Sequence, residues 1–148
     1  IQDIIETGIK LDAEISPQVL VNIFVPKTPL HDGAVVISNN KITAAACILP
    51  LADDKDIARE LGTRHRAAIG ISKESDAIAV VVSEETGKIS IAKDGTLIAD
   101  VKEDALKRIL IKNLVTARFG SEQRVSKISK MKEKWASRKS KKTNETKE

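Results

Sequence analysis

The sequence contains very few cysteine and aromatic residues. Cys47 is the only cysteine among 148 residues, which excludes an intramolecular disulfide and a multi-cysteine metal site and indicates a reducing compartment. Tyrosine is absent, and Phe24, Phe119 and Trp135 are the only aromatic side chains. These leave almost no surface on which nucleic-acid bases could stack, so a single-strand-binding platform is disfavoured.

Long apolar runs and the commonest site motifs are also missing. No stretch approaches the roughly 20 apolar residues that cross a bilayer, and the N-terminal "IQDIIETGIK" lacks the residue order of a signal peptide. We therefore expect the chain as given to be soluble. The patterns GxxxxGK[ST], GxGxxG, HExxH and GxSxG are absent, which removes the usual nucleotide-binding and hydrolase signatures.

The positive charge is concentrated at the C-terminal end. Residues 119–148 hold ten Lys and Arg against four Asp and Glu, a net +6, whereas the remaining residues hold 15 against 17, a net −2. The basic balance therefore does not indicate nucleic-acid binding. We expect one domain followed by a disordered basic tail at 120–148. A weak apolar stripe leaves open an amphipathic helix on an anionic membrane or a partner; it consists of Val125, Ile128, Met131 and Trp135.

Apolar periodicity predicts alternating helices and hairpins. We expect a helix at 16–25, two strands within 33–51 joined at Asn39 and Asn40 with Pro50 ending the second, and two helical pieces within 53–75. Two strands and a short third follow within 76–101, and an amphipathic helix covers 102–119. The prediction is an α/β, α+β-like fold with a mixed sheet flanked by helices.

Three polar clusters interrupt the apolar segments where strands or helices meet loops: "HDGA" at 31–34, "GTRHR" at 62–66 and "SEE" at 83–85. Such positions are where α/β folds commonly bind ligands. In "GTRHR", Thr63 can cap a helix whose free N–H groups attract anions, and Arg64 and Arg66 add positive charge. Arginines two apart point to different sides of a helix, so both reach one ligand only if it is as large as a polyphosphate. The alternative is a capped helix with surface arginines and a packed His65.

The clusters at 31–34 and 83–85 can each be interpreted either as a binding site or as an ordinary turn. His31 and Asp32 offer one nitrogen and one oxygen to a divalent ion such as Mn²⁺, and Asp32 can accept a proton from a hydroxyl nucleophile. Asp-Gly is also common turn chemistry. In "SEE", Glu84 or Glu85 can coordinate a divalent cation or orient a ribose hydroxyl, and the alternative is a solvated hairpin turn.

The order of the clusters is more specific than any one of them. "LHDGAVVI", "AAACILPL" and "ELGTRHRAAIGISKESDAIAVVVSEETGKISIAKDG" closely resemble the diadenylate cyclase domain, from about Ile5 to Phe119, and most of all its membrane-anchored CdaA type. The resemblance implies a catalytic domain at 1–119 with a mixed central sheet surrounded by helices. It also implies a nucleotidyltransferase that condenses two ATP, one on each of two facing protomers, into the second messenger cyclic di-AMP and two pyrophosphates, with Mn²⁺, Mg²⁺ or Co²⁺.

The resemblance also assigns residues. It makes Asp32 the residue that activates the ribose 3′-hydroxyl, and it implies that Leu49 binds adenine through its main chain with Ile48 nearby. The catalytic set is Asp32, Arg64 and Arg66; the ATP-binding set is Gly33, Ala34, Leu49, Thr63, Arg64, His65, Arg66, Ser83 and Glu85; the metal set is His31, Asp32 and Glu84, with the choice between Glu84 and Glu85 open.

Two departures from the family pattern shape the remaining expectations. Members of this type carry membrane helices and an early helix and strand ahead of the matching region, and the sequence shows neither, so we expect a truncated N-terminal part and a domain that belongs at the cytoplasmic face of the membrane. Nothing corresponds to the DNA-binding region of the DNA-scanning branch, so no nucleic-acid partner is expected, whereas regulatory protein partners are. The rival functions are a regulator that binds ATP or cyclic di-AMP without catalysis, and an interaction module that works through its tail.

Overall fold

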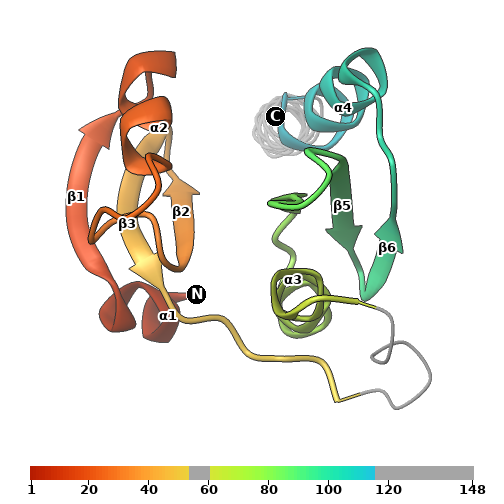
Figure 1. The fold of residues 1–148 in the computed structure, drawn as a ribbon, viewed down its shortest axis with the longest axis horizontal. Coiled ribbons are helices and arrows are strands. Elements are labelled where there is room, and N and C mark those ends of the chain that lie inside the picture. Colours follow the sequence, from red (N-terminus) through yellow and green to blue (C-terminus); the bar gives the residue numbers. More distant parts are fainter. Residues whose placement is uncertain (54–60, 116–148) are drawn as a thin grey trace, which may run out of the picture. The chain divides into compact units, whose positions relative to one another are not determined.

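The computed structural model describes residues 1–53 and 61–115. It contains two compact units, Ile1–Val101 and a second that begins at Lys102, and each is described by itself. The first unit holds two three-stranded sheets in which neighbouring strands are antiparallel, with orders β1-β3-β2 and β4-β5-β6 (Figure 1). The expected combination of helices and sheet is confirmed. The described strands form two antiparallel sheets rather than one mixed sheet, because short hairpin loops return the chain beside the strand it has just left.

The first sheet is built around a two-residue hairpin. Strands β2 (Ala34–Ser38) and β3 (Lys41–Cys47) are joined by Asn39 and Asn40, whose φ angles of 50° and 62° confirm the predicted turn. β3 ends at Cys47 and not at Pro50, because the next N–H, that of Ile48, donates to the Thr7 hydroxyl instead of to a strand.

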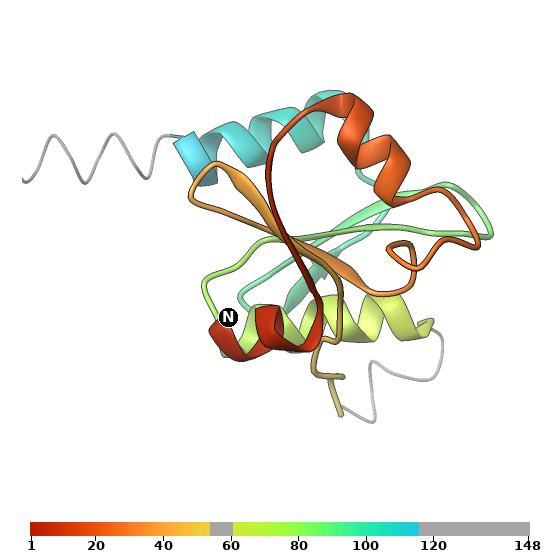
Figure 2. The ribbon, with the colours of Figure 1, turned by 90° about the vertical axis from the view of Figure 1, so that its left-hand side faces the viewer.

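Helix α2 (Pro17–Ile23) confirms the helix expected at 16–25. The Ser16 hydroxyl accepts a hydrogen bond from the Val19 N–H at 3.2 Å, and Pro17 occupies the first turn. The helix buries Ile23 against Ile42 and Ala45 of β3. α2 and α1 (Gln2–Thr7) lie toward opposite ends of the strands of this sheet (Figure 1 and Figure 2).

The N-terminal residues form elements that the sequence analysis did not assign. Residues 2–7 form α1, and β1 (Ile9–Glu14) pairs with β3, so residues 2–14 supply one helix beside the first sheet and one strand within it. Both elements are only six residues long. Polar residues alternate along β1, and its register is interrupted near Asp12, whose φ is 48°.

The second sheet supports helix α3 (Thr63–Glu74). Strands β4 (Ala79–Val82), β5 (Ile89–Lys93) and β6 (Thr96–Ile98) confirm the three strands predicted within 76–101. α3 packs on β4 and β5 and buries Ala68 and Ile69 against Val81 and Ala92. This packing fixes the N-terminus of α3 and the end of β4, where two of the three polar clusters occur.

The second unit begins with α4 (Glu103–Leu110), which continues into a π-helical turn, η1 (Ile111–Val115). The predicted helix at 102–119 is confirmed as far as residue 115. The last residues of this helix and the predicted tail at 120–148, with the boundary between the two, lie outside the described residues. The first helical piece predicted within 53–75 lies largely outside them as well. Among the described residues, no helix is long and apolar enough to cross a membrane.

Candidate functional site

Glu84 brings residues of the three polar clusters together. Its Oε2 lies 2.7 Å from Nη1 of Arg64, and its Oε1 lies 3.5 Å from Nε2 of His31. Glu84 follows β4, Arg64 lies in the first turn of α3, and His31 lies in the loop before β2. The Arg64 and Glu84 side chains are 46% and 56% exposed, so the group is open to a ligand from solvent.

The loop that carries His31 and Asp32 is fixed by close backbone packing. The His31 N–H donates to the Thr28 carbonyl oxygen at 3.2 Å. Gly33 has a φ of +122°, and a Cβ there would lie 2.6 Å from the carbonyl carbon of Ala46. Only glycine fits this position, because both the backbone conformation and the space exclude a side chain. Asp32 is thereby held, exposed, beside His31 at the start of β2.

The start of α3 differs in one detail from the sequence prediction. Gly62, not Thr63, is the N-cap residue, and no side chain caps the helix, so the predicted Thr63 cap is wrong. The Gly62 carbonyl oxygen accepts hydrogen bonds from the N–H groups of His65 and Arg66 at 3.1 and 3.2 Å. Thr63 is the first helical residue and is exposed, at the end of the helix where the dipole favours anions.

The "RHR" residues point to three different partners. Arg64 contacts Glu84, whereas Nε and Nη2 of Arg66 both donate to the Ala52 carbonyl oxygen at 3.4 Å. Nε2 of His65 lies 3.4 Å from the hydroxyl of the buried Ser90 on β5. The expected divergence of the two arginines is thus observed. Arg64 alone of the three lies with Glu84 and His31.

Within "SEE", Ser83 closes a turn. Its N–H donates to Lys88, its carbonyl oxygen accepts from Gly87, and its hydroxyl accepts from the Thr86 N–H at 3.3 Å. Glu85 is exposed and forms no ion pair with any residue that the structure describes. Of the two carboxylates that the sequence left open, Glu84 is therefore the one that joins the cluster.

The predicted metal ligands are only partly grouped in the structure. Within residues 1–53 and 61–115, no group of three or more His, Cys, Asp and Glu side chains could hold a metal ion. His31, Asp32 and Glu84 therefore do not form one complete ligand group, although His31 and Glu84 are in contact. One imidazole and one carboxylate still suit a borderline divalent ion such as Mn²⁺ when a substrate supplies phosphate oxygens.

Thr7 is a residue that the sequence analysis missed. Its hydroxyl accepts a hydrogen bond from the Ile48 N–H at 2.9 Å and donates to the Ile4 carbonyl oxygen at 2.7 Å. It therefore fixes the chain directly before Leu49, which is half-buried, while the Ile48 side chain is 70% exposed. No motif marks a threonine at the end of a six-residue helix, so the sequence carried no signal for it.

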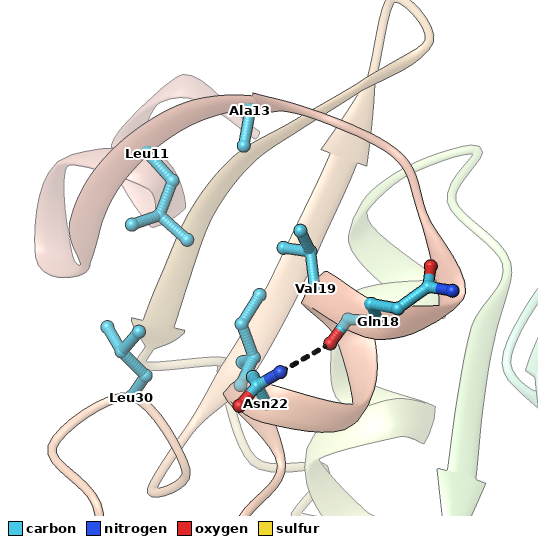
Figure 3. Close-up of a pocket in the computed structure, with 7 residues that line it drawn as sticks. Leu11, Ala13, Gln18, Val19, Asn22 and Leu30 are labelled. Atoms are coloured by element: carbon cyan, nitrogen blue, oxygen red, sulfur yellow. Dashed lines mark hydrogen bonds between the residues drawn. The ribbon is translucent and has the colours of Figure 1, made fainter.

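An apolar pocket lies elsewhere in the first unit. It has a volume of about 320 Å³ and is lined by Leu11, Ala13, Gln18, Val19, Asn22, Ile23 and Leu30 (Figure 3). The Asn22 side-chain amide donates to the Gln18 carbonyl oxygen at 2.8 Å, as the dashed line shows. Because none of these side chains is ionisable, the pocket supplies no acid or base.

The sequence matches known proteins of one family. The family model described as "DisA bacterial checkpoint controller nucleotide-binding", DAC, matches residues 1–97. The chain is 60% identical over 114 residues to a diadenylate cyclase of Listeria monocytogenes serotype 1/2a (strain 10403S), covering 77% of this chain and 42% of that protein. It is 57% identical over 108 residues to the cyclic di-AMP synthase CdaA of Bacillus subtilis (strain 168), covering 73% and 40%. The chain thus spans less than half the length of these relatives.

Solved structures agree with the sequence matches. The crystal structure of a double mutant of DacA from Staphylococcus aureus matches with a TM-score of 0.75 at 51% identity, over 77% of this chain and 76% of that one. A structure described as a hypothetical membrane spanning protein from Bacillus cereus matches with a TM-score of 0.62 at 53% identity, over 64% and 46%. The chain therefore belongs to the diadenylate cyclase domain family and is similar to its CdaA type.

Proposed function

We propose that this chain is the catalytic domain of a diadenylate cyclase, which condenses two ATP into cyclic di-AMP and releases two pyrophosphates. The observation that carries the proposal is the contact of Glu84 with both Arg64 and His31, because it assembles a phosphate-binding cation and two metal ligands next to Asp32. Relatives at 57% and 60% identity bear names that describe this synthesis, which supports the same conclusion.

In the proposed reaction, Asp32 accepts the proton of a ribose 3′-hydroxyl. The freed oxygen attacks the α-phosphorus of the second ATP, the new O3′–P bond forms, and the bond to pyrophosphate breaks. The exposed carboxylate of Asp32, held by the Gly33 backbone at the start of β2, is suited to this role because it can approach a bound nucleotide. Repeating the step with the roles exchanged closes the ring.

Phosphoryl transfer depends mainly on charge neutralisation and alignment, and residues of this chain supply the neutralisation. Arg64 and the N-terminal end of α3, including Thr63, neutralise the triphosphate, and His65 holds this turn through Ser90. A divalent ion held by His31 and Glu84 would neutralise further phosphate charge. Ser83 and Glu85 would lie beside the phosphates on the turn after β4.

Other residues would bind the adenosine part of ATP. Gly33 and Ala34 let the nucleotide approach the backbone, and the main chain of Leu49 binds the adenine base. Because one chain has one such site, each protomer presents one ATP, and the reaction requires two protomers face to face. In the intact protein we place this domain at the cytoplasmic face of the membrane, in keeping with a relative described as membrane spanning.

The proposal is tested by identifying the product. The purified chain is incubated with ATP and Mn²⁺, Mg²⁺ or Co²⁺, and products are separated by chromatography with mass detection. We expect cyclic di-AMP and pyrophosphate in a ratio of one to two, at a rate that rises faster than linearly with protein concentration. ATP binding without product, in a chain shown to dimerise, would contradict catalysis and favour a regulatory nucleotide-binding module. Absence of both binding and product would reject the nucleotide site altogether.

A further inference from the structure

The segment from Ile48 to Ala52 is fixed at both ends by hydrogen bonds. At its start, the Ile48 N–H donates to the Thr7 hydroxyl at 2.9 Å. At its end, the Ala52 N–H donates to the Arg66 carbonyl oxygen at 3.1 Å, and the Arg66 guanidinium returns two bonds of 3.4 Å to the Ala52 carbonyl oxygen. Arg66 therefore holds one residue through both its main chain and its side chain.

Helix α3 also packs against this segment without an intervening side chain. A Cβ added to Gly70 would collide with the Pro50 carbonyl oxygen and would lie 2.9 Å from its carbon and 3.1 Å from the Ala52 nitrogen. Gly70 is fully enclosed in the helix packing. The backbone of α3 therefore sets the depth at which the segment lies, and Arg66 and Thr7 set its two ends.

Leu49 lies between these fixed ends with its main chain available. Its backbone forms no hydrogen bond with any residue that the structure describes, and its side chain is half-buried. A fixed peptide edge with a free N–H and a free carbonyl can pair with a heterocycle that offers an acceptor beside an amino group. Adenine offers this pattern at N1 and N6, whereas guanine presents the reverse, a donor at N1 beside the O6 acceptor.

We propose that Arg66 and Thr7 are positioning residues for base recognition: they fix the Ile48–Ala52 segment so that the Leu49 main chain reads adenine, and Arg66 does not bind phosphate. This inference rests on the proposed function, because it assumes that ATP is the ligand. It separates the two arginines of "RHR" by role, with Arg64 for the triphosphate and Arg66 for the base.

The test compares the binding of ATP with that of inorganic tripolyphosphate, which lacks the base, by calorimetry on the full chain. The variants are Thr7→Val, Arg66→Met and Arg66→Lys. We expect each to weaken ATP binding about tenfold, the scale of one or two lost hydrogen bonds, and to leave tripolyphosphate binding within about twofold. In turnover assays the KM for ATP rises while kcat is retained, and the preference for ATP over GTP falls.

Two controls make the result decisive. Thr43→Val removes a β3 hydroxyl that lies 2.9 Å from the Ser38 hydroxyl of β2. This change should leave ATP binding unchanged. Thermal midpoints show whether each variant is folded, and Thr7→Val tests the start of the segment if the Arg66 variants are unstable. A phosphate role for Arg66 predicts instead that Arg66→Met weakens ATP and tripolyphosphate binding equally and that Arg66→Lys restores both.

The outcomes for the two proposals are separable. Binding of ATP and tripolyphosphate that changes in parallel in the Arg66 variants, or a Thr7→Val chain with unchanged ATP affinity, would overturn the positioning roles while leaving cyclic di-AMP synthesis intact. A wild-type chain that binds ATP but makes no cyclic di-AMP would contradict the cyclase function, and the binding comparison would still decide the roles of Arg66 and Thr7.

Discussion

Glu84 and Arg64 form an ion pair of 2.7 Å between the end of β4 and the first turn of α3. The same carboxylate lies 3.5 Å from His31, so it is shared between a guanidinium and an imidazole. Because both side chains of the ion pair are about half exposed, the pair itself adds little stability. Its consequence is positional: the pair holds Arg64 beside the metal-ligand candidates.

Glu84→Gln should raise the concentration of Mn²⁺ or Mg²⁺ needed for half-maximal activity by at least about 10- to 100-fold, because losing a group that only supports a metal ligand already costs that much. The substitution keeps the size of the side chain but removes the charge that a cation needs. Metal titrations of initial rate measure this shift. Glu85→Gln, the matched comparison, should have a much smaller effect, and an equal effect of both would contradict the assignment of Glu84.

Arg64→Ala should lower kcat/KM for ATP by roughly 10²- to 10³-fold, as for other groups that stabilise charge in a transition state. It should also weaken tripolyphosphate binding, unlike the Arg66 variants. Steady-state kinetics and calorimetry provide the measurements. Arg108→Ala, which removes an exposed arginine of α4, is the control for total charge and should be close to wild type.

Gly33→Ala should destabilise the fold by more than about 1 kcal/mol, because a side chain there meets the Ala46 backbone and a φ of +122° is unfavourable for alanine. Urea unfolding monitored by circular dichroism measures the free energy. Gly62→Ala is the matched control, since nothing lies within 4 Å of its added Cβ. Equal stabilities of the two variants would show that the loop before β2 is not packed as described.

Cys47 should react slowly with iodoacetamide in the native chain and rapidly in urea. Burial raises the pKa of its thiol, because desolvation disfavours the thiolate, and the thiolate is the reactive form. The unfolded thiol then ionises first as the pH rises, so this contribution to stability is full near neutral pH and is lost in the alkaline range. Mass spectrometry of timed alkylation checks the prediction, and fast native labelling would contradict it.

The parts of the fold that the sequence predicted depend on local chemistry. Asn39 and Asn40 tolerate positive φ and specify a hairpin, and Ser16 followed by Pro17 begins a helix. The "RHR" spacing was informative in the same way, because residues two apart on a helix diverge, and Arg64 and Arg66 do contact different partners.

The parts that the sequence did not predict depend on contacts between distant residues. β1 was missed although apolar and polar residues alternate along Ile9–Glu14, the pattern of a half-buried strand; what that pattern does not show is that the partner is β3. The hydrogen bonds between Thr7 and Ile48 and between Arg66 and Ala52 likewise join residues far apart in the sequence, so neither residue type nor spacing predicts them. The choice between Glu84 and Glu85 needed the position of α3 against β4, because a turn need not follow strand alternation.

The most direct test of the account compares cyclic di-AMP formation and ATP binding in the wild-type chain and in Asp32→Asn, which keeps the shape of the side chain but removes the proton acceptor. We predict cyclic di-AMP from the wild type, a rate lower by about 10²- to 10⁴-fold in Asp32→Asn, and ATP affinities that agree within about twofold. An Asp32→Asn chain that makes cyclic di-AMP at the wild-type rate, or a dimeric wild-type chain that binds ATP and makes none, would contradict the account.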